Sequence, residues 1–550
     1  MRLLVADPID ESGLRLLREA GGLRVDVRTG LSERELVRLI PSYAGLIVRS
    51  ATRVTARVIE AGGRLQVIGR AGVGLDNVDL DAATARGIAV LNAPSGNLHS
   101  AAEHTIGMLL ALARNIPQAD RALRHGDWDR KRFTGTEVRG KTLGLIGFGN
   151  VGRRVGRMAQ GLGLKVLVYD PYLPAERVSR EGAEPASFPR LLRSSDFISL
   201  HTPLTDQTRG LIDARAISRM KRGVRIVNVG RGGLIDEGAL CRALKRGKVA
   251  GAALDVFERE PIPGDHPLLS LGNVIVTPHL GASTAEAQAE VSLEIAREIL
   301  KGLRNGHFNG AVNVPFRLPE DGSDDVQRRL ELSERLGRVQ IQLLEGQPRL
   351  LRVTCDAAHG SLLDALTAFA LKGVFEGLVD RMVNHINSGL IARERGLAVE
   401  KGVLPEGGGD GVLLYRGVVL LDLVTERRSL RVAGAVFPDG TERLVELDGR
   451  HVEARLEGRI LIMFNKDVPG VIGRVGTLLA EAGVNIGEWR LGRREPGGVA
   501  VSAINVDDAV PKSTLQRIGG LKEVQSVKEI RLPEAVSPDS RVAKGRTVSL

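Results

Sequence analysis

Over roughly its first 95 residues the chain alternates short apolar runs with stretches whose apolar positions recur every three or four residues. Short apolar runs favour buried strands, and the longer period favours helices that cover them. Strands are predicted at Leu3–Ala6, Val25–Val27, Gly45–Val48, Gln66–Gly69 and Ala89–Asn92, with helices at Glu11–Ala20, Ser32–Ile40 and Thr55–Ala61. Such alternation predicts a parallel sheet covered on both faces.

The alternation resumes after Ser100–Ala113, a stretch that is apolar on nearly every side and is predicted to be a buried helix. His104 in this helix is interpreted as a buried histidine with hydrogen-bond partners rather than as a ligand. Further strands are predicted at Leu143–Ile146, Lys165–Tyr169, Phe197–Leu200, Arg225–Asn228, Gly251–Asp255 and Val274–Thr277. The long amphipathic stretch Ser283–Leu303 is predicted to return the chain to the first sheet. Two doubly wound parallel-sheet domains are therefore expected, residues 1–96 with 284–308, and residues 97–283.

The pattern changes beyond residue 308. Residues 310–455 mix helices with strands such as Gly417–Leu421 and Leu430–Val436, which predicts an α+β domain. Residues 458–533 read as strand, helix, strand, strand, helix, strand, which predicts a ferredoxin-like module. The polar and basic residues 535–550 are predicted to be a flexible tail.

Composition limits the class of protein. The chain has 550 residues, 43% of them hydrophobic and 26% charged, which is typical of a globular protein with several cores. No apolar run reaches the ~18 residues of a membrane span, and Asp7 and Asp10 interrupt the first run before a signal-peptide core could form. Cys241 and Cys355 are too few and too far apart for a disulfide framework or a metal site, so a cytoplasmic protein without a metal is predicted.

The net charge of +11 raises the question of nucleic acid. The basic residues are mostly arginines scattered among acids, and only 3% of residues are aromatic. A solvated basic surface is favoured over a nucleic-acid interface, and a smaller part of the excess positive charge is expected to bind an anionic substrate.

Three glycines with the spacing of a dinucleotide-binding loop follow the strand predicted at 143–146. Gly147 lets the strand turn sharply, Gly149 lets the backbone approach a pyrophosphate, and Gly152 lets the next helix pack closely. Asp170 ends the following strand, about 20 residues further on, where an acid binds a ribose diol. Because a carboxylate repels a 2′-phosphate, the pattern favours NAD over NADP.

Arg231, Glu260 and His279 each follow one of three successive predicted strands. The arginine fork can hold a carboxylate and a 2-oxygen, and the histidine can take a hydroxyl proton as hydride leaves. Glu260 can fix the tautomer of His279 and raise its pKa. Each residue alone would suit an ordinary surface, but together they predict oxidation of a 2-hydroxy acid.

Two loops follow strands of the first sheet, at residues 48–52 and 69–77, and are expected to face the same crevice. Backbone N–H groups at Gly72 and Gly74 can hold a carboxylate. Ordinary turn formation is the alternative explanation for these glycines.

These segments resemble the long-form D-3-phosphoglycerate dehydrogenases, a group of the D-isomer-specific 2-hydroxyacid dehydrogenase family. The resemblance covers residues 1–310 nearly throughout and implies NAD-dependent oxidation of 3-phosphoglycerate to 3-phosphohydroxypyruvate, the first step of L-serine biosynthesis, by a homo-oligomer (a dimer or tetramer). It is carried by Ile47–Thr52, Gly69–Asn77, Asn92–Asn97, Ser100–Glu103, Gly147–Gly152, His201–Pro203, Asn228–Gly232, Ala253–Pro261 and Pro278–Ala282.

The resemblance also implies roles for single residues. Arg231 binds substrate, Glu260 orients the histidine, and His279 is the acid/base. The cofactor contacts are Gly147, Gly149, Asn150, Val151, Gly152, Asp170, Thr202, Val229, Gly230, Asp255 and Gly281. The substrate contacts are Arg49, Ser50, Val73, Gly74 and Asn97, with Arg49 at the phosphate. Arg130 or Arg132, in the charged segment 126–135, would reach a neighbouring subunit, although a solvated loop also fits that segment.

The C-terminal module resembles an ACT domain, a small-molecule regulatory fold, and residues 310–455 resemble the intervening domain of the long-form enzymes. Asn465, Asp467 and Asn485 are the implied contacts for L-serine as an effector. Helix capping and turn formation remain the alternative role for these three residues.

Two residues depart from the usual pattern of the family, and two alternative functions remain. Gly230 stands where Ala is usual and Val73 where Thr is frequent, and neither change removes a charged group. One alternative is another D-2-hydroxyacid dehydrogenase without a phosphate requirement. The other is an NAD-sensing corepressor-like binding protein, against which the intact Arg231, Glu260 and His279 argue.

Overall fold

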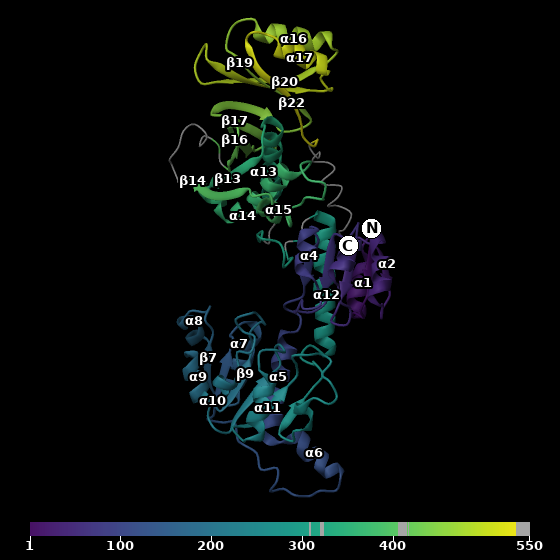
Figure 1. Cartoon of the computed structure of the whole chain (residues 1–550), viewed down its shortest axis with the longest axis vertical. Helices are drawn as coiled ribbons and strands as arrows, with labels where there is room; N and C mark the ends of the chain where they lie inside the picture. The colour runs from purple at the N-terminus through teal and green to yellow at the C-terminus, as the bar shows by residue number, and fades with distance from the viewer. Residues whose placement is uncertain (307, 309, 320–323, 405–414, 416, 535–550) are drawn as a thin grey trace.

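The computed structural model describes residues 1–534 except 307, 309, 320–323, 405–414 and 416. Four sheets follow one another along an elongated molecule (Figure 1). The seven-stranded sheet lies at one end, followed by the five-, six- and four-stranded sheets. The predicted tail, 535–550, lies outside the described residues.

The first sheet is parallel, with strand order β2-β1-β3-β4-β5. Its strands are β1 (Arg2–Val5), β2 (Arg24–Val27), β3 (Gly45–Val48), β4 (Val67–Arg70) and β5 (Ala89–Asn92). Its helices are α1 (Glu11–Glu19), α2 (Glu33–Leu39), α3 (Ala56–Ala61) and α4 (Leu80–Ala85). The predicted strands and helices are confirmed to within one or two residues, whereas α4 was not predicted.

The second sheet is also parallel, with order β12-β11-β10-β9-β6-β7-β8. Its strands are β6 (Thr142–Ile146), β7 (Lys165–Tyr169), β8 (Glu184–Pro185), β9 (Phe197–Leu200), β10 (Val224–Asn228), β11 (Val249–Leu254) and β12 (Val274–Val276). Its helices are α5 (Leu98–Arg114), α6 (Ile116–Arg124), α7 (Asn150–Gly161), α8 (Ala175–Arg180), α9 (Phe188–Ser194), α10 (Ala214–Arg219) and α11 (Glu237–Lys245). The strand order reverses between β6 and β9, and ligands bind at such a switch point.

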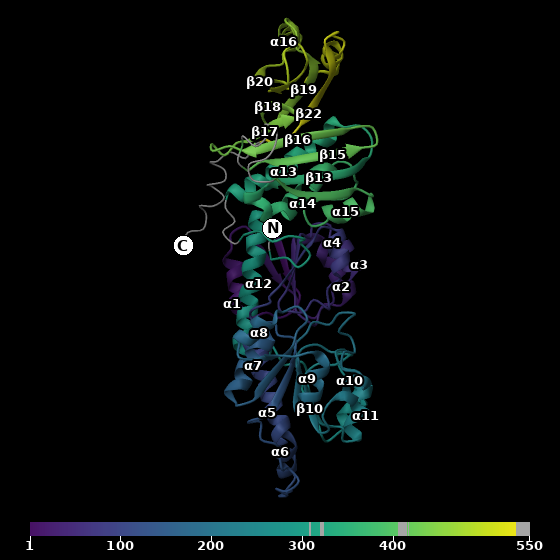
Figure 2. The ribbon, with the colours of Figure 1, turned by 90° about the vertical axis from the view of Figure 1, so that its left-hand side faces the viewer.

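Helix α12 (Ala285–Asn305) returns the chain to the first sheet, as predicted, and runs along it (Figure 2). Ile295 and Ile299 are fully buried in the same cluster as Leu3 and Leu91. A Cβ at Gly69 would lie 2.5 Å from the Ile299 side chain, so the glycine lets α12 approach β4. The helix that packs against the first sheet therefore comes after the second sheet in the sequence.

The third sheet is mixed, with order β14-β13-β15-β16-β17-β18 and one parallel pair, β13 with β14. Its elements are α13 (Asp324–Leu343), β13 (Pro348–Asp356), α14 (Leu363–Phe375), α15 (Ser388–Glu394), β14 (Ala398–Leu404), β15 (Val419–Thr425), β16 (Ser429–Val436), β17 (Glu442–Leu447) and β18 (Arg450–Arg455). The α+β character predicted for this part is confirmed.

The fourth sheet is antiparallel, with order β20-β21-β19-β22, which is the predicted ferredoxin-like arrangement. Its elements are β19 (Arg459–Lys466), α16 (Val471–Glu481), β20 (Ile486–Arg493), β21 (Val499–Val506), α17 (Lys512–Gly519) and β22 (Val524–Arg531). Leu461, Met463 and Val475 are among the buried residues between the sheet and its two helices.

The segment Val383–Asn387 connects the domain of the third sheet to the domain of the first sheet. Asn384 Nδ2 donates to the carbonyl of Gly87 at 2.7 Å. Ile386 is buried in the core of the first sheet, whereas the ring of His385 stacks on Phe369 of α14 at 5.3 Å. The C-terminal half is thus joined to the N-terminal half by packed side chains as well as by the chain itself.

Within the described residues, no helix is both long enough and apolar enough to cross a membrane. The same residues contain no group of three or more His, Cys, Asp or Glu side chains arranged to hold a metal ion. Cys241 and Cys355 are both buried free thiols.

Candidate active site

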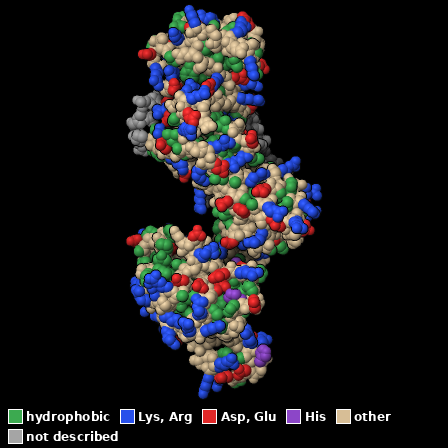
Figure 3. All heavy atoms as spheres, viewed as in Figure 1, with side chains coloured by type: hydrophobic (Ala, Val, Ile, Leu, Met, Phe, Trp, Pro, Cys, Tyr) green, Lys and Arg blue, Asp and Glu red, His purple; other side chains and the backbone are tan. Residues whose placement is uncertain are grey.

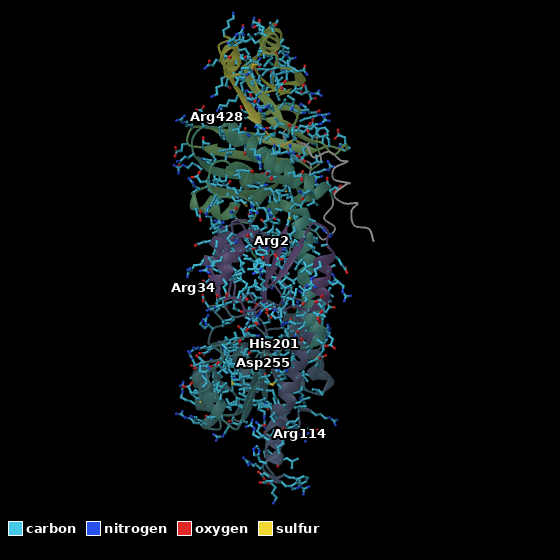
Figure 4. All side chains as sticks on the ribbon, turned by 90° about the vertical axis from the view of Figure 1, so that its right-hand side faces the viewer. Arg2, Arg34, Arg114, His201, Asp255 and Arg428 are labelled. Carbon is cyan, nitrogen blue, oxygen red and sulfur yellow. The ribbon has the colours of Figure 1, made fainter. Side chains whose placement is uncertain are left out.

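The candidate site lies where the carboxyl ends of the first two sheets face each other. The molecular surface is hollowed between the domain of the seven-stranded sheet and the rest of the molecule (Figure 3). His201 and Asp255 lie at the edge of the seven-stranded sheet that faces the five-stranded sheet (Figure 4). Both residues directly follow strands, β9 and β11, as expected for a site at the ends of parallel strands.

The three glycines predicted to bind a dinucleotide form the turn between β6 and α7. Gly147 has φ +90°, and a Cβ there would lie 2.6 Å from the carbonyl oxygen of His201. A Cβ at Gly152 would collide with the carbonyl of Gly147. No described atom lies within 4 Å of a Cβ position at Gly149, so its backbone faces open space. The turn can therefore admit a pyrophosphate at the N-terminus of α7.

The other predicted cofactor residues lie at the start of α7 or in loops that follow strands of the second sheet. Asp170 Oδ2 accepts from the Phe148 N–H at 2.9 Å, which holds the carboxylate beside the glycine turn. Thr202 Oγ1 is buried and has no hydrogen-bond partner among the described residues, as expected where a ligand supplies the partner. Asn150 begins α7, Val151 is half-buried, and Val229 is buried beside Gly230. These features fit a bound dinucleotide.

His279 and Glu260 form the predicted acid/base pair. His279 Nδ1 lies 2.7 Å from Glu260 Oε2, and Glu260 Oε1 accepts from the Phe257 N–H at 3.0 Å. The hydrogen bond to Glu260 raises the pKa of His279, although burial opposes the shift. Burial raises the pKa of Glu260, but hydrogen bonds from His279 and the Phe257 N–H outweigh it and lower the pKa overall. Nδ1 is thus engaged, and Nε2 is left for a substrate.

We expect Glu260→Gln to move the pH profile of kcat/KM for hydroxy-acid oxidation. Only neutral His279 can accept a proton, so kcat/KM rises as the pH increases through the pKa of His279. The variant removes the group that raises this pKa, so the rising limb shifts to lower pH. Glu258→Gln is the matched control, because the Glu258 carboxylate accepts from the Glu237 N–H at 3.3 Å rather than contacting His279. An unmoved limb in Glu260→Gln would contradict the assignment.

Asp255 organises the turn that carries His279. Its fully buried carboxylate accepts from Thr277 Oγ1 at 2.5 Å, the Leu280 N–H at 2.7 Å and the Gly281 N–H at 2.9 Å. Burial opposes ionisation, but these donors and His104 lower the pKa of Asp255. His279 itself has φ +56°, a left-handed conformation that costs about 1 kcal/mol or more and must be held by such contacts.

Arg231 joins the two halves of the site. Its Nη1 donates to the carbonyl of Gly230 at 2.8 Å, and its Nε lies 3.7 Å from Asp76 Oδ2 on the loop after β4. A Cβ at Gly74 would lie 2.7 Å from Arg231 Nη2, so the glycine leaves room for the guanidinium. The predicted residues Arg231 and Gly74 are therefore together, although they come from different sheets.

The loop after β3 is held by two side chains that the sequence did not identify as part of the site. Buried Asp7 accepts from the Arg49 N–H at 2.6 Å and from Thr52 Oγ1 at 2.7 Å. Asn77 Nδ2 donates to the Arg49 carbonyl at 2.6 Å. Ser50 is exposed in this loop. Asp7 lies just beyond the end of β1, and Asn77 lies in the loop at 69–77 that was predicted to face the crevice; these positions were the available signals for the two residues.

The other predicted substrate residues lie on neighbouring loops. The carbonyl of Val73 accepts from Asn92 Nδ2 at 2.8 Å, which ties the loop after β4 to the end of β5. Asn97 occupies the N-cap position of α5, where the chain passes from the first sheet to the second, and its side chain makes no capping hydrogen bond within the described residues.

Arg70 is a further candidate that the sequence did not identify. Burial, together with the nearby charges of Arg231 and Arg49, lowers the pKa of Arg70 to about 10. Its Nε is buried without a hydrogen-bond partner in the described structure. Three guanidinium groups thus gather on one side of the crevice, where a carboxylate and a phosphate would relieve their repulsion.

The three candidate effector residues do not meet within one chain. Asp467 pairs with Arg493 at the end of β20, which lowers the pKa of Asp467. Asn485 precedes β20 and donates to Asp507. A strand of eight residues is about 25 Å long, so the two candidates lie far apart. Asn465 is buried, with its Oδ1 3.5 Å from Ser502 Oγ.

Profiles of known families match three parts of the chain. Residues 106–281 match the D-isomer specific 2-hydroxyacid dehydrogenase NAD-binding domain, residues 325–448 the D-3-phosphoglycerate dehydrogenase intervening domain, and residues 459–523 the ACT domain. A D-3-phosphoglycerate dehydrogenase of Archaeoglobus fulgidus is 41% identical over 525 residues, covering 94% of this chain and 97% of that protein. The chain belongs to the D-isomer specific 2-hydroxyacid dehydrogenase family.

Solved structures of similar fold support the family membership. The TT0316 protein of Thermus thermophilus is 36% identical with a TM-score of 0.51, covering 56% of this chain and 98% of its own. A formate dehydrogenase of Staphylococcus aureus in complex with NAD is 29% identical with a TM-score of 0.51, covering 56% of this chain and 96% of its own. The predictions of the family, of the α/β fold and of an NAD-dependent oxidoreductase are confirmed.

Proposed function

We propose that this family member oxidises 3-phosphoglycerate to 3-phosphohydroxypyruvate with NAD, the first step of L-serine biosynthesis. The observation that carries the proposal is the group of Arg49, Arg70 and Arg231 around one crevice, beside the His279–Glu260 pair. A substrate with both a carboxylate and a phosphate matches three cations better than a simple hydroxy acid does. The name of the Archaeoglobus fulgidus relative agrees with this choice.

In the proposed reaction, bound NAD supplies the hydride acceptor. Arg231 binds the substrate carboxylate and the 2-oxygen, which orients the C–H bond. His279 Nε2 takes the hydroxyl proton, and the carboxylate of Glu260 stabilises the resulting imidazolium through Nδ1. The cations of Arg49 and Arg70 hold the phosphate.

The test is formation of NADH, followed by absorbance, with 3-phosphoglycerate, glycerate and 2-hydroxyglutarate as alternative substrates. The proposal expects the highest kcat/KM for 3-phosphoglycerate. A clear preference for glycerate or 2-hydroxyglutarate would replace it with another D-2-hydroxyacid dehydrogenase. No turnover of any hydroxy acid, together with tight NADH binding, would favour the corepressor-like alternative.

We expect Arg70→Met to raise the KM for 3-phosphoglycerate by roughly 10- to 100-fold, since a hydrogen bond to a charged group contributes about 1.5–3 kcal/mol. The KM for glycerate, which lacks the phosphate, should change less than about threefold. Arg64→Met is the matched control, because Arg64 is exposed just after α3. Equal losses for both substrates would show that Arg70 does not recognise the phosphate.

Association between copies is a further part of the proposal. Helix α6 buries none of its side chains, and Leu123 and Trp128 are 54% and 75% exposed. In the charged segment 126–135 that follows α6, Arg132 pairs with Asp127 and Arg130 is exposed. Exposed apolar side chains that gather on one segment can mark an association surface, which supports a dimer or tetramer. Light scattering that gives the mass of one chain would exclude it.

L-serine is proposed as an effector at the ACT domain. Because Asp467 and Asn485 lie at opposite ends of β20, a site containing both requires two chains. Calorimetry and the NADH assay with added serine test this point, and neither heat nor inhibition would exclude it. A cytoplasmic location is also proposed, and both cysteines being free thiols supports it.

A further inference from the structure

We propose that His104 is a positioning residue that holds the turn carrying His279, through the buried carboxylate of Asp255. The inference rests on the proposed function only in that the turn belongs to a dehydrogenase site. His104 lies on α5, the helix through which the chain passes from the first sheet to the second. Its Nε2 lies 3.3 Å from Asp255 Oδ1 and 3.3 Å from Thr277 Oγ1.

The contacts define the role of each atom. Thr277 has one hydroxyl proton, which it donates to Asp255 Oδ1 at 2.5 Å. The carboxylate and the remaining lone pairs of Thr277 can therefore only accept from His104. The proton of a neutral His104 must then lie on Nε2, where it is shared between the two oxygens. His104 is in this way a fixed donor and not merely a buried side chain.

The carboxylate of Asp255 needs this donor. The side chain of Asp255 is fully buried, and a buried charge is stable only when its hydrogen bonds are satisfied. Asp255 Oδ1 accepts from Thr277, from the Leu280 N–H and from His104, and Oδ2 accepts from the Gly281 N–H. Apart from His104, all these donors belong to the turn itself. His104 therefore ties this carboxylate, and the turn bound to it, to α5.

The position of His279 depends on that turn. The His279 N–H donates to the carbonyl of Asp255 at 2.9 Å, and its backbone is held at φ +56°. Loss of the His104 contact releases Asp255 from α5, so the carboxylate and the turn bound to it can shift together and move the imidazole of His279. Small displacements of a reacting group affect kcat more than substrate binding.

The test compares His104→Leu, His104→Gln and His104→Asn. The amide nitrogen of glutamine can occupy the place of Nε2, whereas the shorter asparagine cannot reach it. We expect His104→Leu and His104→Asn to lower kcat about 10-fold or more, with the KM for 3-phosphoglycerate within about threefold of wild type. His104→Gln should recover most of the kcat. If His104→Leu fails to fold, the comparison of His104→Gln with His104→Asn still tests the role of the Nε2 donor.

Hydrogen–deuterium exchange separates this inference from the proposed function, because it requires no turnover. The Leu280 and Gly281 amides, both bound by Asp255, should lose about 10-fold protection in His104→Leu and His104→Asn, but not in His104→Gln. Unchanged protection together with an unchanged kcat would overturn the inference. Equal behaviour of the two amide variants would also overturn it. A wild-type enzyme inactive on 3-phosphoglycerate would instead reject the proposed substrate.

Discussion

Replacing His279 with alanine should lower kcat for hydroxy-acid oxidation by ~10²-fold or more. The variant loses the base that receives the hydroxyl proton, and Glu260, 2.7 Å from Nδ1, keeps within the described structure only its hydrogen bond from the Phe257 N–H. The glycine turn at 147–152 and Asp170 are not altered, so NADH binding should stay within about threefold of wild type. Stopped-flow absorbance and NADH fluorescence measure the two quantities separately.

His266→Ala is the matched control for His279. Its imidazole contacts Glu237 at 3.1 Å rather than Glu260. We expect its kcat to fall far less than that of His279→Ala. If both variants retain wild-type kcat, neither imidazole is the base, and the proton must leave by another group.

Replacing Arg231 with leucine should lower kcat/KM by roughly 10²- to 10³-fold, because removing one partner of a desolvated charge pair costs about 2–5 kcal/mol. Arg231 Nε and Nη1 are held by Asp76 and the Gly230 carbonyl. The geometry therefore presents a fixed fork to a carboxylate, which lysine cannot reproduce. Arg231→Lys should recover less than a tenth of the lost activity.

Steady-state kinetics with 3-phosphoglycerate measure both Arg231 variants. Arg219→Leu, at the exposed end of α10, controls for the loss of one positive charge from the same half of the molecule. A kcat/KM near that of wild type in Arg231→Leu would mean that the substrate carboxylate is bound elsewhere. The Gly72–Gly74 backbone would then be the next candidate.

Uninterrupted apolar runs and clear periodicity predicted most elements well, whereas elements that have neither were missed. The strands Gly45–Val48 and Phe197–Leu200 are fully buried, and their uninterrupted apolar runs mark them in the sequence. Helix α4 has only six residues, Leu-Asp-Ala-Ala-Thr-Ala, too few for a periodic pattern to appear. Strand β8 has two residues and is defined by its pairing with β7 rather than by its composition.

Site residues with a known motif could be predicted, whereas those defined by distant contacts could not. His279 and Glu260 are 19 positions apart in sequence and meet as expected. Asp7 seemed only to interrupt an apolar run, yet it binds the loop of Arg49, 42 residues away. The importance of Arg70 depends on Arg231, on another sheet, and no local pattern brings the two together.

The hydrogen bond from Asn384 to the carbonyl of Gly87 links the C-terminal half of the chain to β5, which leads to the substrate loop. Gly87 precedes β5, and Asn92, the last residue of β5, holds the carbonyl of Val73. The strand covers that interval in about 15 Å. A shift of the C-terminal half that pulls on Gly87 is therefore transmitted to the substrate loop through one rigid strand, and the glycine turn of the second sheet lies outside this path. We therefore expect a displacement of the C-terminal half to change the affinity for the hydroxy acid more than the affinity for NAD.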